Sequence, residues 1–147
     1  MNNEDVRVLR VIETPYDLED KNVVCYPQLV LYFRIRIFRL FMQPRVVYSA
    51  VTVDLVKGEA ARSNKFPRSE AIEISEAAVI PALTTHEAAI EEAEKLLLRW
   101  LRHKYKIYRI PQMDIVKQRE VHKVFFYAQL KNNETVLIDS VKGLEMQ

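Results

Sequence analysis

Three histidines and one cysteine are the residues of this chain whose side chains most often bind metals or attack substrates. They are His86, His103, His122 and Cys25. A zinc site needs several such ligands at helical or turn spacing, and none of these histidines has a second ligand at such a spacing. Cys25 has no histidine at a suggestive position either, so we interpret it as a buried or neutral thiol rather than a nucleophile. We therefore expect no metal and no cofactor.

Asp54 and Asp139 are the carboxylates that could act as a pair, because the sequences around them match. The two endings read VTVDLVKGE at 51–59 and VLIDSVKGLE at 136–145, and they contain Gly58 and Gly143, the only glycines of the chain. A catalytic or metal-binding pair is one interpretation. We favour a strand followed by a turn, in which each carboxylate accepts a backbone amide two residues on and each glycine supplies a positive φ.

The remaining motifs argue against an enzyme. A phosphate-binding loop needs clustered glycines, and two isolated ones cannot supply it. No serine lies in a Gly-x-Ser-x-Gly elbow, so the nucleophile of that hydrolase motif is missing too. We expect a non-catalytic protein with no catalytic residue.

The residues named above must be positioned by the rest of the chain, and most of it has the composition of β-strands. The segment 23–42 is dense in Val, Ile, Leu, Phe and Tyr, which predicts a long strand, and Gln43-Pro44 is expected to turn the chain into a partner strand at 45–56. The residues 29–32 also align with 124–127, so the matched endings predict a hairpin used twice. Further strands are expected at 6–13, 70–75, 113–119, 121–130 and 135–141.

One long amphipathic helix is predicted from Thr84 to Lys106. Thr84 precedes Glu87 by three residues, as in a capping box, and Thr85 is the rival cap. Apolar residues recur at three- and four-residue spacing, which gives one face able to lie on a sheet. They are Ile90, Ala93, Leu97, Trp100, Leu101 and Tyr105.

These elements predict an α+β fold in which an antiparallel sheet, built from two related β-hairpins, packs on the helix. A chain of 147 residues with 49% hydrophobic residues suits a single domain over 1–147. Within it we assign 1–59 to the first strand and long hairpin, 60–83 to a connecting segment, and 84–147 to the helix and three strands.

The second half resembles the PepSY domain family. A Thr-capped helix with Ala88 and Ala93 is followed by three strands, and the chain closes on an apolar strand, Asp139, a polar residue and Gly143. The resemblance covers 84–147, and the first hairpin looks like a degenerate second copy without its own helix. It implies a non-catalytic module of the kind found in protease propeptides and cell-envelope proteins.

Composition and charge restrict the cellular location and the kinds of partner that we expect. The N-terminus has no basic region followed by an apolar run, and no span of about 18 apolar residues exists, so we expect neither a secretory signal nor a transmembrane segment. The lone cysteine indicates a reduced, cytoplasmic protein, although a mature secreted chain would look similar. Charge alternates in blocks: Lys and Arg outnumber Asp and Glu by 8 to 2 over 25–69, while 70–94 holds seven acidic residues and no basic one.

The segment Arg34–Val47, which we call the ribbon, is the main candidate for a binding surface. It reads RIRIFRLFMQPRVV and is too apolar for a solvated arm, so we predict a protein-interaction or regulatory module that self-associates through it. The expected partner is a second copy or another protein, and the sequence does not indicate a small-molecule ligand. The candidate binding residues are Arg34, Arg36, Phe38, Arg39, Phe41, Arg45, Arg99 and Arg102.

Binding to nucleic acid or to an anionic surface is the alternative. The arginines of the ribbon and of the basic end of the helix would neutralise phosphates, while Tyr32, Phe33 and Tyr105 would offer faces on which bases stack. Arginine on an exposed strand face beside Glu-rich segments is also a common device for solubility, so the pattern alone does not decide.

Overall fold

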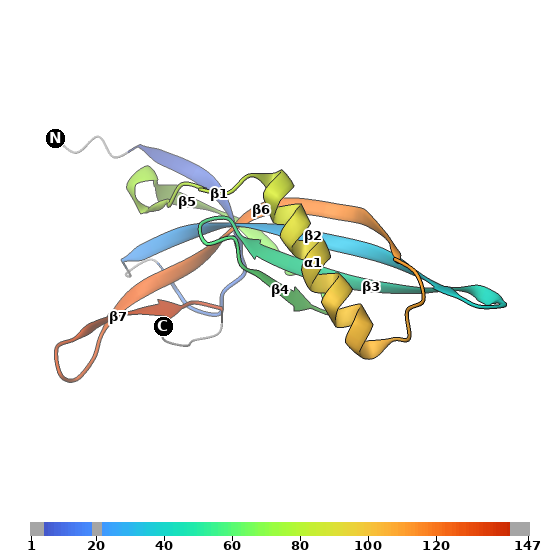
Figure 1. The fold of residues 1–147 in the computed structure, drawn as a ribbon. Helices are drawn as coiled ribbons and strands as arrows, with labels where there is room; N and C mark the ends of the chain where they lie inside the picture. Colours follow the sequence, from blue (N-terminus) through green and yellow to red (C-terminus); the bar gives the residue numbers. More distant parts are fainter. Residues whose placement is uncertain (1–4, 19–21, 142–147) are drawn as a thin grey trace. The chain divides into compact units, whose positions relative to one another are not determined.

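The computed structural model describes residues 5–18 and 22–141, and Figure 1 shows its elements. Seven strands and one long α-helix make up most of these residues. The strands are β1 (Val6–Ile12), β2 (Val23–Arg39), β3 (Met42–Asp54), β4 (Ala60–Ser63), β5 (Ser69–Ser75), β6 (Gln112–Gln129) and β7 (Thr135–Asp139). The helices are the 3-10 turn η1 (Glu76–Ala78) and α1 (His86–Lys104).

The strands form one mixed sheet rather than two antiparallel hairpins on a helix. Their order is β4-β3-β2-β6-β1-β5, and β7 pairs with β6 beside this path. β1 runs parallel to β6, with Val11 opposite His122, and antiparallel to β5. The predicted fold class, an α+β fold with an antiparallel sheet of two related hairpins on one helix, is therefore wrong.

Strand β6 explains the error. Two strands were predicted here, at 113–119 and 121–130, but β6 runs through as one strand of 18 residues in which Arg119 and Glu120 are exposed. β1 then pairs with this strand although more than a hundred residues separate Val11 from His122. Local patterns report which residues form a strand, but they do not report which distant strand it pairs with.

The chain forms two compact units. Unit 1 comprises Met1–Gln28, Pro67–Ala82 and Glu120–Gln147, and unit 2 comprises Leu29–Phe66 and Leu83–Arg119. The matched endings fall in different units, with Asp54 in unit 2 and Asp139 in unit 1. The single domain over 1–147 stays a prediction.

In unit 2, α1 packs on one face of the sheet. Phe33, Ile35 and Ile37 alternate with exposed arginines along β2, so one face of this strand is buried and the other is open. The helix begins at His86 because Thr85 is its cap: the Thr85 hydroxyl accepts a hydrogen bond from the Ala88 amide at 3.1 Å. The helical residues that bury fully against the sheet are Ala89, Ala93, Leu97 and Leu101.

Unit 1 has a smaller core of its own. Leu9 and Val11 of β1 pack with Cys25 of β2 and Val124 of β6. Half-buried residues surround these four, namely Leu18, Val23, Ile72, Ile74 and Val79. Strand β5, at the place of the strand predicted at 70–75, supplies two of them and lies at the end of the strand order.

Candidate interaction surface

The ribbon folds into the distal part of the β2–β3 hairpin, and its turn lies at Leu40-Phe41. Gln43-Pro44, the predicted turn, belongs to β3 instead. Because β4 pairs only with residues 50–53 of β3, Pro44 lies where one edge of that strand is open, and an open edge tolerates proline. Phe41 adopts the positive φ of the turn, at 60°.

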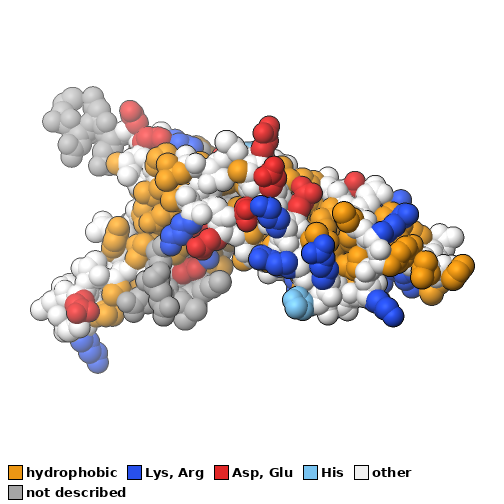
Figure 2. All heavy atoms as spheres, in the orientation of Figure 1, with side chains coloured by type: hydrophobic (Ala, Val, Ile, Leu, Met, Phe, Trp, Pro, Cys, Tyr) orange, Lys and Arg blue, Asp and Glu red, His pale blue; other side chains and the backbone are white. Residues whose placement is uncertain are grey.

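The three residues at this turn expose large apolar side chains. Leu40 is 63% exposed, Phe41 104% and Met42 61%. We call Leu40, Phe41 and Met42 the tip. Figure 2 shows hydrophobic side chains at this end of the hairpin, beside lysine and arginine side chains. A bulky residue rarely adopts positive φ, because its Cβ then crowds the backbone at a cost of about 1 to 2 kcal/mol. Phe41 thus has an unfavourable backbone conformation and an exposed ring at the same position.

The arginines of β2 differ in the contacts that their side chains make. Arg34 forms an ion pair with Asp114 of β6 at 3.5 Å. Arg39 donates its Nε–H to the Gln43 carbonyl at 2.9 Å, which braces the turn across its base. Arg36 is exposed and makes no hydrogen bond or ion pair within residues 5–18 and 22–141. It is therefore the ribbon arginine that is most available to a partner.

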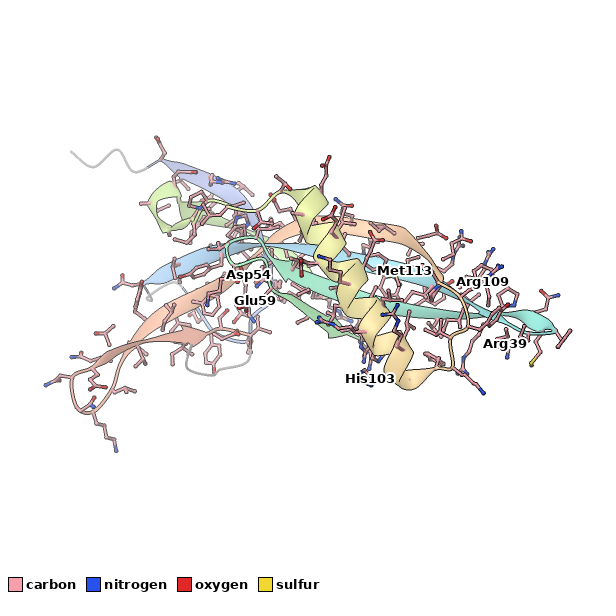
Figure 3. All side chains as sticks on the ribbon, viewed as in Figure 1. Arg39, Asp54, Glu59, His103, Arg109 and Met113 are labelled. Atoms are coloured by element: carbon pink, nitrogen blue, oxygen red, sulfur yellow. The ribbon has the colours of Figure 1, made fainter. Side chains whose placement is uncertain are left out.

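Phe38 belongs to the fold more than to the surface. It is half-buried, and the guanidinium of Arg109 lies 3.7 Å from the centre of its ring, the distance of a cation–π contact. Arg109 comes from the segment after α1, and Figure 3 labels it beside the hairpin that carries Arg39. Sequence reasoning did not single out Arg109, because nothing local links it to a strand seventy residues earlier.

A second cluster joins the base of the ribbon to the C-terminal end of α1. Arg45 lies 4.9 Å from the centre of the Tyr105 ring, and Arg62 of β4 lies 4.1 Å from the centre of the Trp100 ring. Lys104 Nζ lies 5.4 Å from the centre of the Trp100 ring and 5.8 Å from the centre of the Tyr105 ring. These cations cover the aromatic faces, and Arg45 is thereby held in place.

Arg99 and Arg102 are exposed on α1. In the described part of the chain they form no hydrogen bond or ion pair with the ribbon. The structure thus brings Arg45 to the basic end of the helix, but among the described residues no hydrogen bond, ion pair or ring contact joins Arg99 or Arg102 to the other candidate binding residues.

The face of the sheet opposite α1 carries aromatic residues. Tyr32 of β2 and Tyr48 of β3 stack with their ring centres 5.8 Å apart and their planes 17° apart. Tyr48 and Val46 remain exposed on this face, so apolar surface extends from the tip along the hairpin. Phe33, by contrast, is 1% exposed in the core, so it cannot offer a face for base stacking.

The two aspartates each close a turn. Asp54 Oδ1 accepts the Val56 amide at 2.7 Å, and Asp139 Oδ1 accepts the Val141 amide at 2.9 Å. Gly58 has φ 77°, while Gly143 lies outside the described residues. The Asp54 amide donates a hydrogen bond to the Glu59 carbonyl at 2.8 Å, and Figure 3 labels both residues at the end of β3 away from the tip. Asp139 also forms an ion pair with Lys123 at 2.6 Å, whereas Asp54 forms no ion pair with any residue that the structure describes.

The residues that could do chemistry are dispersed. Cys25 is buried, and burial raises the pKa of its thiol to about 11, which keeps the thiol protonated at neutral pH. His122 is buried in unit 1, and burial lowers the pKa of its imidazole. The negative charge of Glu120 raises this pKa in part, and the positive charge of Arg7 lowers it further. Within the described residues, no three His, Cys, Asp or Glu side chains group closely enough to hold a metal ion.

No family model matches this chain, and searches of curated proteins and of solved structures find no match either. The resemblance of 84–147 to the PepSY family therefore stays a prediction. In the described parts of the chain, no helix combines the length and the apolar character needed to span a bilayer.

Proposed function

We propose that this protein is a non-catalytic interaction module that self-associates through its ribbon. One observation carries the proposal: Phe41 is fully exposed at φ 60°, between two other exposed apolar residues. Backbone strain that the packing does not require is more often found at functional sites than elsewhere. An exposed apolar cluster on a projecting hairpin is a surface that association would bury.

The experiment compares variants whose folds should be intact. Phe41→Asn removes the ring, and asparagine tolerates positive φ, so this variant keeps the turn. Leu83→Asn is the matched control, since Leu83 is an apolar residue of unit 2 that is 75% exposed outside the ribbon. Sedimentation velocity at micromolar concentrations should show association of the wild type and of Leu83→Asn, and monomers for Phe41→Asn. A monomeric wild type would overturn the proposal.

The nucleic-acid alternative has weaker support. Phe33 is buried, and the Tyr105 ring already carries Arg45 and Lys104, so two of the three rings expected to stack on bases are engaged in the fold. Exposed Arg36 still favours an anionic partner. Binding to DNA or RNA that weakens with salt, and that Arg36→Gln reduces, would support this alternative over self-association.

A further inference from the structure

Unit 1 contains a groove of about 590 Å³ between residues 14–18, the start of β2 and strand β5. Its floor is apolar and includes Leu18, Val23 and Ile72, which also border the core of the unit. Its charged lining residues are all acidic: Asp17, Glu70 and Glu73. A groove of this size lies within the range of about 300 to 1,000 Å³ that is typical of ligand pockets. It therefore has room for a few apolar side chains.

The ribbon has the complementary chemistry. Its tip presents Leu40, Phe41 and Met42 to solvent, and the charged residues within 34–47 are all arginines. Apolar residues flanked by positive charge match an apolar floor bordered by negative charge. A tip that met the same tip of another copy would instead bring arginines against arginines, which costs binding energy. Charge thus disfavours a contact between identical surfaces.

We propose that the tip of one copy inserts into the unit 1 groove of a second copy. This inference rests on the proposed self-association and names the surface that receives the ribbon. The contact is heterologous, since two different surfaces meet, so a pair of copies joined by one such contact still has one free tip and one free groove. Association can then continue beyond a dimer, and it weakens with salt because opposite charges flank the contact.

Two variants test the contact by disabling one half each. Phe41→Asn loses the tip, and Glu70→Lys with Glu73→Lys reverses the charge of the groove; both glutamates are exposed, so the fold should persist. Each variant alone should associate at least about ten-fold more weakly than the wild type, because it lacks one half of the contact. A ten-fold change in Kd corresponds to about 1.4 kcal/mol. An equimolar mixture should form a 1:1 heterodimer and nothing larger, because one partner supplies the groove and the other the tip.

The outcomes separate this inference from the proposed function. If the groove variant associates like the wild type while Phe41→Asn does not, the ribbon mediates association but the groove does not receive it. If neither variant is impaired, both proposals fail. If both are impaired but the mixture forms no heterodimer, the head-to-tail contact is refuted. Glu70→Gln with Glu73→Gln provides a milder groove variant, which should weaken association and reduce its dependence on salt.

Discussion

The strained turn at the tip makes a prediction about stability that does not depend on any partner. Replacing Phe41 with Asn should stabilise the isolated chain, whereas most substitutions destabilise. Phe41 is 104% exposed, so removing its ring gives up no buried surface. Relief at φ 60° is worth about 1 kcal/mol for a residue that tolerates this region. For a chain of this size, that gain raises Tm by about 3 °C.

The assay is urea unfolding followed by the fluorescence of Trp100, the single tryptophan. A protein concentration below about 1 µM is needed, because association would stabilise the wild type by mass action and hide the effect. The reverse change offers a matched control: Asn133, in the turn between β6 and β7, has φ 64°. Asn133→Phe should destabilise the chain by about 1 to 2 kcal/mol.

A loss of about 1 kcal/mol or more in Phe41→Asn would refute this reasoning. Such a loss would mean that the ring packs on other residues in solution, so that its exposure and strain are not features kept for a partner. It would also remove the observation on which the proposed function rests.

Three further predictions concern unit 1. Asp139→Asn should cost on the order of 3 kcal/mol in urea unfolding, because it leaves Lys123 only 15% exposed without its counter-charge, and adding Lys123→Met should recover most of the loss. Burial lowers the pKa of His122, so the unfolded chain binds a proton at this imidazole more readily than the folded chain does. The stability that neutral His122 contributes is therefore present above about pH 6.5 and falls as the pH drops below that value. In His122→Gln, the urea midpoint should change less between about pH 7 and pH 5 than it does in the wild type. Cys25, with its pKa raised from 9.0 to about 11, should react about 100-fold more slowly with a thiol reagent at about pH 8 than in urea, and an equal rate would refute its burial.

Local patterns predicted individual elements well. The apolar spacing and the threonines located α1 to within two residues at each end, because helix periodicity and capping are encoded within a few residues. Asn132-Asn133 is a residue pair that favours a tight turn, and Asn133 has the positive φ expected of such a pair. Strand β1 was also located; its buried residues are Leu9 and Val11, while Val6 and Val8 are exposed.

The pairing of strands and the assembly of the surface were not predictable in this way. The face of β1 is decided by its neighbours β5 and β6, which lie far away in the sequence. For the same reason, the sequence did not show that Arg109 covers Phe38 or that Arg45 and Lys104 cover Tyr105. Within the ribbon, sequence reasoning identified the apolar and basic residues, and the structure adds that Phe41, rather than Phe38, is the exposed ring.

Photo-crosslinking from position 41 tests the central claim most directly. A benzophenone amino acid replaces Phe41, and equal amounts of ¹⁴N- and ¹⁵N-labelled protein are mixed, so that mass spectrometry can recognise crosslinks between copies. We predict mixed-isotope crosslinks from position 41 to Leu18, Ile72 or Ile74, which line the groove of unit 1. Crosslinks confined to a single copy, or joining position 41 to the ribbon of the other copy, would contradict the head-to-tail contact.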